Sequence, residues 1–330
     1  MNEKLLWTYL GENAVQTIKI ENETPNWKRI SIADALQKHA KKTSGAYTEY
    51  ISSLCNKKGI EWWASRVSEK NPFVSRAFLH ICYLKVAGEL IEGNKCQIIF
   101  IEDKDVFDSV MKNYNDSVVS NISIVNKVAA FFGCGLKIIT SKLRFLAVNI
   151  HHVIFTRYLD RDGKKEPKKN LTIVHTFANK RSFDGNGNFR DSYFGKMPEW
   201  LEKNDRTVVF LPRILDSRIY KETASKLAKN NGVLLWYDYV SILDVFASFS
   251  RELASVFSII KTETTKFQGL DISDIIKRDR TMDLIENRRA SDRLLYFAIK
   301  RMAKKGLRIS EFLYTYENQC WEKILISALR

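Results

Sequence analysis

The 330-residue chain has 45% hydrophobic and 28% charged residues, which are ordinary globular proportions and exclude wholesale disorder. Its 53 Lys and Arg outnumber its 38 Asp and Glu, and the formal net charge is +15. A charge of this size attracts anions, so nucleic acid, an anionic membrane surface or a phosphorylated small molecule are candidate partners. A basic surface that serves only solubility is the remaining alternative.

The cysteines and the N-terminus indicate a cytoplasmic protein without a metal centre. No two of the five cysteines have the C-x-x-C spacing of a zinc site. Cys82, Cys96 and Cys134 lie in apolar stretches, which is typical of buried thiols in a reducing compartment. The first residues lack a secretory pattern, and no uninterrupted apolar run reaches the roughly 18 residues of a membrane-spanning helix.

The first part of the chain predicts a strand at Leu5–Leu10 and helices over 31–54 and 75–91. A clear unit follows. Gln97–Ile101 is a short apolar run typical of a buried strand, and the acidic residues Glu102, Asp103 and Asp105 come directly after it, ahead of a helix.

Two stretches are both amphipathic and cationic. Residues 121–156 are apolar with interspersed lysines and are broken by Gly133 and Gly135, which predicts either a pair of core helices or a face that lies on anionic lipid. Residues 277–308 predict one long helix with a buried face and a cationic face.

The second half alternates predicted strands with helices. The strands are expected at Leu171–Phe177, Thr207–Leu211, Val233–Tyr237 and Phe312–Tyr316, and the helices at Asp216–Lys229, Ser241–Val256 and 318–330. Strands that alternate with helices of this length favour right-handed crossovers and a parallel sheet. We therefore predict an α/β fold with a Rossmann-like parallel sheet flanked by helices.

This pattern also suggests a domain division. Residues 1–95 are expected to be mainly helical, residues 96–270 to form the Rossmann-like core, and residues 271–330 to be a linker helix and the start of a second domain.

The loop at residues 181–195, RSFDGNGNFRDSYFG, separates two predicted strands. Ligands of open α/β sheets bind at the carboxyl ends of strands, where this loop is expected. Asp191 is the first candidate for a general base and Asp184 the second, while Arg181 and Arg190 can clamp an anion. A polar turn held by its own Asn and Asp side chains is the alternative.

Residues 61–73, EWWASRVSEKNPF, are a second candidate site. Trp62 and Trp63 can stack on a sugar ring, and Arg66, Glu69 and Asn71 can donate or accept hydrogen bonds with its hydroxyls. The alternative places one tryptophan in the core and the other on the surface.

The C-terminal stretch YENQCWEKILISALR, residues 316–330, is a third candidate, since a predicted strand ends here and a helix begins. Backbone N–H groups at such a helix start favour an anion, close to Glu317 and Asn318. The alternative is a capping arrangement with Asn318 as the N-cap. Phosphate-loop, dinucleotide-binding, H-E-x-x-H and nucleophile-elbow motifs are missing from the sequence.

Together, WWASRVSEKNP, RSFDGNGNFRDSYFG-x-x-P-x-W and YENQCWEKILISALR resemble bacterial surface-carbohydrate biosynthesis proteins of O-antigen and capsule gene clusters. The resemblance spans about residues 60–330. These proteins look related to glycosyltransferases with two facing Rossmann-like domains, the GT-B fold. The resemblance implies an acceptor-binding N-terminal domain and a donor-binding C-terminal domain, and a complete enzyme of this kind is expected to continue beyond Arg330 into a second nucleotide-binding half.

The resemblance also implies roles. A nucleotide sugar is the expected donor, a glycan or lipid-linked molecule the acceptor, and no cofactor or tightly bound metal is expected because helix N-termini and basic side chains hold the donor phosphates. Trp62, Trp63 and Tyr193 would offer ring faces to sugar. The alternative function is a non-catalytic basic module for an anionic membrane surface or nucleic acid, of which nucleic acid is the less favoured because aromatic residues do not interleave with basic ones.

Overall fold

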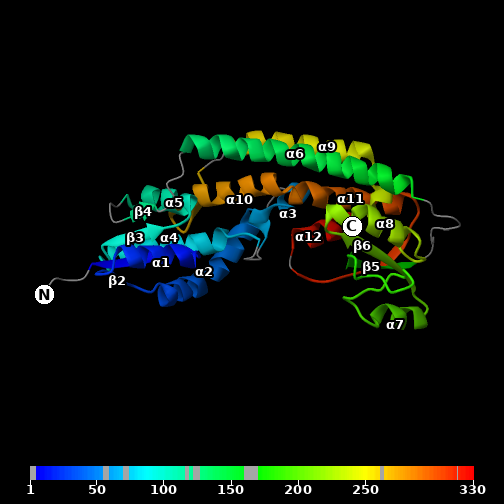
Figure 1. Ribbon diagram of the computed structural model, residues 1–330, viewed down its shortest axis with the longest axis horizontal. Coiled ribbons are helices and arrows are strands. Elements are labelled where there is room, and N and C mark those ends of the chain that lie inside the picture. Colours follow the sequence, from blue (N-terminus) through cyan, green and yellow to red (C-terminus); the bar gives the residue numbers. More distant parts are fainter. Residues whose placement is uncertain are drawn as a thin grey trace. The chain divides into compact units, whose positions relative to one another are not determined.

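The computed structural model describes residues 5–54, 59–69, 74–115, 119–121, 127–159, 170–260, 264–317 and 319–330. The chain forms two compact units (Figure 1). Unit 1 comprises residues 1–138 and 255–286, and unit 2 comprises residues 139–254 and 287–330. The chain therefore passes from one unit to the other three times: within helix α6 (Lys127–Arg157), within helix α9 (Ile242–Ile260), and between helices α10 (Ser273–Glu286) and α11 (Arg288–Lys304).

Unit 1 is built on a parallel four-stranded sheet in the order β2-β1-β3-β4. Its strands are β1 (Leu6–Leu10), β2 (Lys28–Arg29), β3 (Ile98–Ile101) and β4 (Val119–Asn121). Its other elements are α1 (Ala14–Glu23), α2 (Ala33–Ser53), α3 (Gly59–Trp63), the 3-10 turn Arg66–Ser68, α4 (Ala77–Glu92), α5 (Lys104–Tyr114), the hairpin of β7 (Lys266–Phe267) and β8 (Leu270–Asp271), and α10.

Alternation along β3 assigns the two faces of this sheet, because successive side chains of a strand point to opposite sides. Ile98 and Phe100 pack with Trp7 and with Ile20 of α1. Ile99 and Ile101 belong instead to the large core that α2, α4, α5 and α10 complete. Helices on both faces explain why β3 is apolar throughout.

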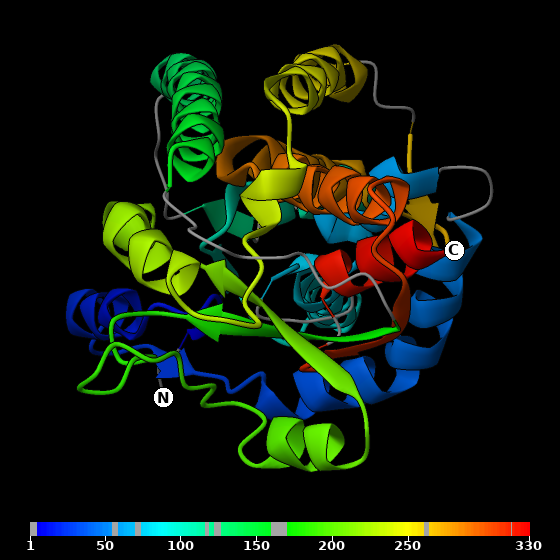
Figure 2. The same ribbon diagram turned by 90° about the vertical axis from the view of Figure 1, so that its right-hand side faces the viewer.

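Unit 2 is built on a parallel three-stranded sheet in the order β6-β5-β9. Its strands are β5 (Leu171–Ala178), β6 (Thr207–Ile214) and β9 (Ile309–Tyr314). Helices α8 (Tyr220–Ala228), α11 and α12 (Cys320–Leu329) cover one face, and the short α7 (Met197–Lys203) covers the other (Figure 2). The central strand β5 is buried on both faces, as a near-continuous apolar run requires.

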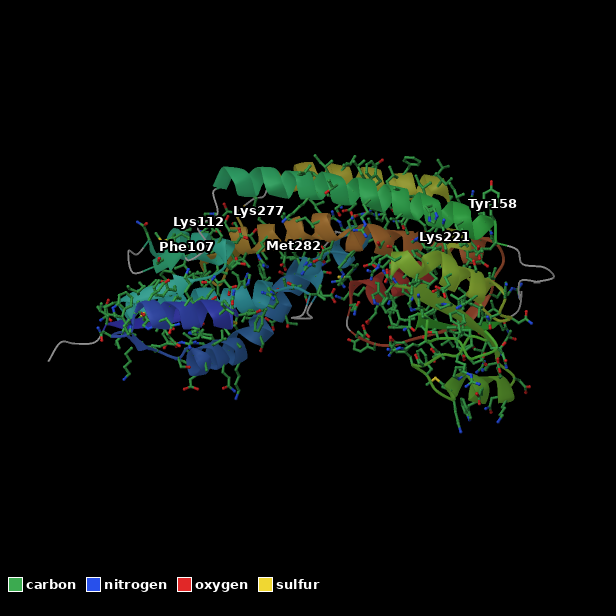
Figure 3. All side chains as sticks on the ribbon, viewed as in Figure 1. Phe107, Lys112, Tyr158, Lys221, Lys277 and Met282 are labelled. Carbon is green, nitrogen blue, oxygen red and sulfur yellow. The ribbon has the colours of Figure 1, made fainter. Side chains whose placement is uncertain are left out.

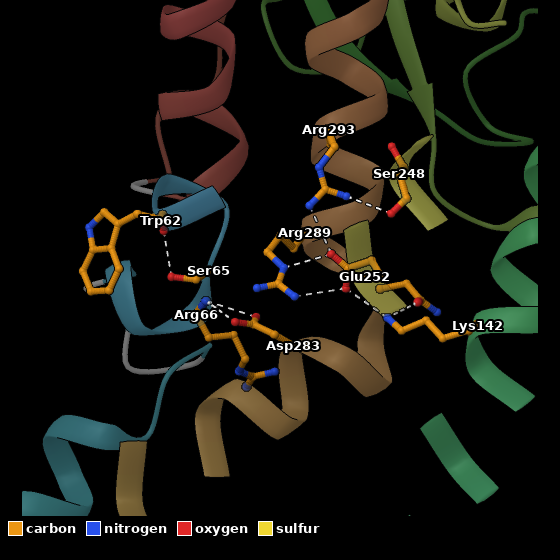
Figure 4. A network of polar contacts seen from close by, with 10 residues as sticks. Trp62, Ser65, Arg66, Lys142, Ser248, Glu252, Asp283, Arg289 and Arg293 are labelled. Atoms are coloured by element: carbon orange, nitrogen blue, oxygen red, sulfur yellow. Dashed lines mark hydrogen bonds and ion pairs between the residues drawn. The ribbon is translucent and has the colours of Figure 1, made fainter. Parts of the chain in front are cut away.

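A buried ionic cluster joins α6, α9 and α11 within unit 2 (Figure 4). The carboxylate of Glu252, with 0% of the residue exposed, accepts hydrogen bonds from Lys142 at 3.1 Å, Arg289 at 2.9 Å and Arg293 at 3.2 Å. Lys142 also donates to Asn287 Oδ1 at 2.7 Å. The Glu252 carboxylate thus balances the charges of several buried cations. The packing of the three helices therefore depends on this one residue.

The structure confirms the predicted α/β class and most strands, but it corrects three predicted elements. Val233–Tyr237 is not a strand: after one bridge from Val233 to Phe210 the chain turns into the 3-10 helix Trp236–Tyr239. Residues 121–156 do not form two helices broken by glycines, since α6 runs without a break from Lys127 to Arg157. The single helix predicted over 277–308 is divided into α10 and α11 at Asn287, whose φ of 56° is left-handed.

The predicted domain division differs from the observed one. The region 96–270 is not a single core, because β3 and β4 pair with β1 in unit 1 while β5 and β6 belong to unit 2. Residues 271–330 do not start a further domain either, since α10 packs in unit 1 and β9 pairs with β5. Strand pairing over long sequence separations decides the division.

Candidate functional site

A polar pocket lies in unit 1, at the carboxyl ends of the adjacent strands β1 and β3. It has a volume of about 450 Å³ and is lined by charged and polar groups that include Glu12, Arg76, His80, Glu102, Asp105 and Arg278. These groups come from the two loops that follow β1 and β3, from α4 and the Arg76 N-cap before it, and from α5 and α10. Ligands of open parallel sheets bind at this edge, so the position of the pocket is that of a ligand site.

Gly11 allows the two strand ends to approach each other. A Cβ atom at this position would lie 2.3 Å from Glu102 Oε2 and 2.6 Å from the Tyr9 ring, closer than any side chain tolerates. The same Glu102 oxygen accepts hydrogen bonds from the Tyr9 hydroxyl at 2.8 Å and from the backbone N–H of Glu12 at 2.8 Å and Asn13 at 3.2 Å. Glu102 therefore holds the β1–α1 loop in place and shapes the pocket wall.

His80 forms the floor of the pocket and is 3% exposed. Its Nε2 lies 4.0 Å from Asp103 Oδ2, and its Nδ1 makes no hydrogen bond to the described residues. Burial lowers the pKa of His80 to about 4; Asp103 opposes this shift, whereas Arg278 and Arg76 add to it. The imidazole is therefore neutral at pH 7.

Asp103 holds neighbouring groups in position. Its Oδ1 caps α5 by accepting from the N–H of Asp105 at 3.0 Å and of Val106 at 3.3 Å, and its Oδ2 pairs with Arg278 Nε at 3.0 Å. With both oxygens engaged, Asp103 is a positioning group rather than a base.

Asp105 is the carboxyl group of the pocket best suited to accept a proton. Desolvation and, second, the neighbouring Asp103 carboxylate raise its pKa to about 6, against the opposing effect of Arg278 and Lys104. The side chain keeps 39% of its surface exposed, and its Oδ2 lies 3.8 Å from Arg278 Nε. An accessible carboxylate with a pKa near neutrality is matched to general base catalysis.

Cations balance the carboxylates around the pocket. Arg76 pairs with Glu12 at 3.1 Å, and Arg278 bridges Asp103 and Asp105. A mixture of donors and acceptors suits a ligand that carries several hydroxyl groups. A second hollow of about 480 Å³, lined by Ile30 and Leu36 among others, shares Gly11 and Tyr83 with the pocket and extends the same edge toward β2.

The raised pKa of Asp105 predicts a pH-dependent cost to stability. The folded protein binds this proton more tightly than the unfolded chain, so stability falls as pH rises from about 4 to about 6. We expect Asp105→Asn to raise the free energy of unfolding at pH 7 by about 1 kcal/mol, a value reduced for the exposed part of the side chain. The gain should vanish at pH 4 in urea titrations. Glu49→Gln, an exposed change on α2, is the control, and equal gains at both pH values would contradict the prediction.

In unit 2, the loop after β5 contains the acidic residues predicted as bases. Asp191 accepts hydrogen bonds from the Thr176 hydroxyl and from the backbone N–H of Tyr193 at 3.2 Å and Phe194 at 2.6 Å. Both of its oxygens thus order the turn before α7. Its contacts are those of the polar-turn alternative.

Asp184 has a similar place in the same loop. Its Oδ1 accepts hydrogen bonds from the backbone N–H groups of Asn186 and Asn188, each at 2.9 Å. These bonds lower the pKa of the Asp184 carboxyl, and the bond from Asn188 has the larger effect. Its Oδ2 lies 3.5 Å from Nε of the exposed Arg190. Arg181 is exposed, and the Tyr193 ring is half-exposed and packs on Phe177 at 5.3 Å. The loop keeps its two arginines and one ring face open to solvent.

The predicted sugar platform around Trp62 is corrected by the structure. Trp62 is only 6% exposed and belongs to the core of unit 1, so its ring face is not open to a sugar, whereas Trp63 is half-buried. The backbone N–H of Arg66 donates to Asp283 at 2.9 Å (Figure 4). The Arg66 guanidinium lies 2.5 Å from Glu286. Glu69 is 1% exposed. The tryptophan therefore matches the alternative with one ring in the core, and Arg66 ties the 3-10 turn to α10.

The C-terminal candidate is built around a capping box. Gln319 is the N-cap of α12, not Asn318, and the buried Glu322 accepts from the N–H of Glu317 at 2.8 Å and of Gln319 at 3.0 Å. Glu317 is exposed and accepts from the Gln319 side chain at 2.5 Å. Asn71 and Asn318 lie outside the described residues.

The unit 1 pocket was not identified from the sequence as a site. The signal was present, because Glu102, Asp103 and Asp105 follow the predicted strand 97–101 and Gly11 and Glu12 follow the strand 5–10. Only the pairing of Leu10 with Ile101 brings the two segments together. The sequence around Arg278 gives no sign that this residue lies beside Asp103 and Asp105.

No protein-family model, curated protein or solved structure matches the chain. Among the described residues, no group of three or more His, Cys, Asp and Glu side chains is placed to hold a metal ion. The pocket residues named above can donate and accept hydrogen bonds, form ion pairs and exchange protons.

Proposed function

We propose that the protein is a glycosyltransferase related to the GT-B enzymes and built from two Rossmann-like units. It would transfer a sugar from an activated nucleotide donor to a hydroxyl of a glycan or lipid-linked acceptor in bacterial surface polysaccharide biosynthesis. The observation that carries the proposal is the unit 1 pocket, where the half-exposed Asp105 lies beside cations at the carboxyl edge of a parallel sheet.

The pocket of unit 1 is the acceptor side in this proposal. Attack by an acceptor hydroxyl requires loss of its proton, and Asp105 takes that proton as the oxygen bonds to the donor's anomeric carbon. The bond from that carbon to the donor phosphate breaks, and the nucleotide leaves with the electron pair. Arg76 and Arg278 donate hydrogen bonds to neighbouring acceptor oxygens, and Glu12 accepts from neighbouring hydroxyls. Asp103 and Glu102 keep the two loops that carry these groups in register.

The donor side in this proposal is the carboxyl edge of the unit 2 sheet. The exposed Arg181 and Arg190 would hold the donor phosphates, and the open face of Tyr193 would stack on a ring of the donor. Glu317, exposed after β9 at the same edge, would accept hydrogen bonds from sugar hydroxyls.

Donor binding predicts selective stabilisation by one class of nucleotide sugar. In a thermal-shift screen against CMP-, UDP-, GDP- and TDP-sugars, the matching donor at a hundredfold excess over its dissociation constant should stabilise the fold by about 2.7 kcal/mol. Arg181→Gln with Arg190→Gln should weaken this shift, whereas Lys203→Gln with Lys229→Gln, the same charge change elsewhere on unit 2, should leave it intact. A flat response to all four classes would contradict the donor site.

The alternative is a non-catalytic basic module, which the net charge of +15 favours. The pocket favours transfer over this alternative, because its carboxylates Glu12, Glu102, Asp103 and Asp105 repel a phosphate backbone while they suit hydroxyl groups.

A further inference from the structure

Helix α6 turns its apolar side outward within unit 2. Ile139, Leu143, Ala147 and Ile154 recur at intervals of four, four and seven residues and are exposed, with Leu143 57% exposed. Such spacing places them in one stripe along the helix. The opposite, buried side carries the polar residues Lys142, Asn149, His152 and Thr156 beside the apolar Phe145 and Val153. A surface helix of a water-soluble protein normally shows the reverse distribution.

Helix α9 repeats this inverted pattern. Leu243, Phe246 and Leu253 are exposed, with Leu243 at 78%, and Ala247 and Ala254 complete the stripe. Its buried side carries Ser248 and Glu252. Two helices of one unit that both expose apolar stripes make a patch of the kind that marks an interaction surface.

Polar contacts fix both helices in this orientation. Lys142 of α6 and Glu252 of α9 are bonded to each other at 3.1 Å, and Glu252 is bonded to α11 through Arg289 and Arg293. Further along α6, Asn149 accepts from the Tyr237 hydroxyl at 2.6 Å. Rolling either helix to hide its leucines would expose these groups and break the ionic cluster, so the outward apolar face is the stable one.

The two stripes lie on the same side of unit 2. Figures 1 and 2 both show α6 and α9 on the side of α11 that faces away from strands β5 and β6. Figure 3 shows Tyr158, which is 85% exposed, pointing outward at the end of α6. We define the outer face of unit 2 as the exposed residues Ile139, Leu143, Ala147, Ile154, Tyr158, Leu243, Phe246, Ala247, Leu253 and Ala254.

Charge indicates what covers this face. Arg144 and Arg157 flank the α6 stripe on its two sides, Arg251 flanks the α9 stripe, and all three are exposed. Apolar side chains bordered by arginines suit the boundary between the acyl chains and the anionic headgroups of a bilayer. There the apolar side chains insert among the acyl chains, and the arginines pair with the headgroup phosphates. A second copy of the chain, with the same charge of +15, would bring like charges together at this border.

We propose that the outer face of unit 2 binds an anionic lipid bilayer, with α6 and α9 lying in its interface. Residues 135–157 are long and apolar enough to cross a membrane by length and composition. The helix lies on the surface instead, because its inner side is packed on the core of unit 2 through Phe145 and Val153 and tied to α9 through Lys142. The inference does not depend on the transfer chemistry proposed above.

Flotation of the full chain with vesicles tests the proposal. Vesicles of phosphatidylcholine containing phosphatidylglycerol should bind the protein, and pure phosphatidylcholine vesicles should bind it weakly. Leu143→Glu with Leu243→Glu should reduce binding at least about a hundredfold, since two leucines are lost from the acyl region. Leu215→Glu, at an exposed leucine outside α6 and α9, is the matched control and should bind as the parent does.

A second pair of variants tests the charge. Arg144→Gln with Arg157→Gln should weaken binding to the anionic vesicles at least about tenfold, and leave the weak binding to phosphatidylcholine unchanged. Lys203→Gln with Lys229→Gln makes the same charge change elsewhere and should have little effect. Circular dichroism of each variant confirms that these exposed changes leave the fold intact.

Three results would overturn the inference: no binding to either vesicle, unchanged binding of the double glutamate variant, or a dimer in sedimentation that this variant dissociates while vesicles are ignored. The last result would assign the outer face to a second copy. Transfer to a water-soluble acceptor should be unaffected by the double glutamate change, so a failure of this inference is separable from a failure of the glycosyltransferase proposal.

Discussion

Glu252→Gln should lower the free energy of unfolding by about 3–5 kcal/mol, the usual cost of removing one partner from a buried ion pair. The substitution keeps the shape of the side chain but removes its charge. Lys142 and Arg293 are each almost fully buried and Arg289 is 13% exposed at its side chain, so their charges would stay desolvated without the carboxylate. The effect should be large because α6, α9 and α11 all contribute to this cluster.

Urea unfolding monitored by circular dichroism measures the loss. Glu222→Gln, which removes an exposed ion pair with Lys226 on α8, is the control and should cost at most about 1 kcal/mol. The double variant Glu252→Gln with Lys142→Met should recover part of the loss, because one buried cation is removed with its partner. A Glu252→Gln protein as stable as the parent would show that the cluster does not hold these helices together.

The same cluster predicts a dependence on acid. Burial alone raises the pKa of Glu252, but Arg289, Lys142 and Arg293 outweigh burial and hold it below its ordinary value. A carboxylate with a lowered pKa stabilises the fold above the pKa of the unfolded chain, about 4.3, and that stabilisation is lost as pH falls further. The difference between the parent and Glu252→Gln should therefore shrink below about pH 4.

Asp105→Asn should reduce the turnover number of sugar transfer by about 10²–10⁴, the usual contribution of a general base. The amide cannot take the proton of the acceptor hydroxyl, although it keeps the shape of the side chain and one accepting oxygen. Binding of the acceptor should change little, so the loss should appear in kcat and not in KM. Measurement requires the donor class that the thermal-shift screen selects.

The pH profile separates a base from a structural residue. With Asp105 as the base, the parent's activity should rise with pH through about 6, where this carboxyl loses its proton, and the variant should lack that rise. Asp191→Asn in the same assay tests the rival base from the unit 2 loop. If Asp191→Asn abolishes transfer and Asp105→Asn is fully active, the base belongs to unit 2 and the role of the pocket is wrong; Glu49→Gln should be active in either case.

The local pattern of apolar and polar residues is sufficient to predict much of the secondary structure. Leu171–Phe177 and Gln97–Ile101 were expected as strands because short apolar runs bounded by polar residues suit a sheet covered on both faces. Val233–Tyr237 has the same composition, yet it forms a 3-10 turn after a single bridge to β6. An apolar run indicates that a segment is buried. It does not show that the segment is a strand, because other segments of a core are buried as well.

The candidate site shows the same limit. The acidic residues after β3 were visible in the sequence, but their significance depends on β1, which lies some ninety residues earlier, and on Arg278 of α10. The loop at 181–195 carries Asp, Asn and Gly residues, which suit catalysis and turns equally well. In the structure, Asp184 and Asp191 accept hydrogen bonds from backbone N–H groups of turns.

The sequence by itself determined the α/β class, the basic character and most helices and strands of this protein, because these follow from composition and from periodicities within a few residues. Only the tertiary structure decided that β1 lies beside β3 and β5 beside β9, that the chain therefore forms two units, and that α6 and α9 bury polar groups and expose leucines. These features depend on contacts between residues far apart in the chain. An amphipathic pattern shows that a helix has two faces, and the partners of Lys142 and Glu252 decide which of them is buried.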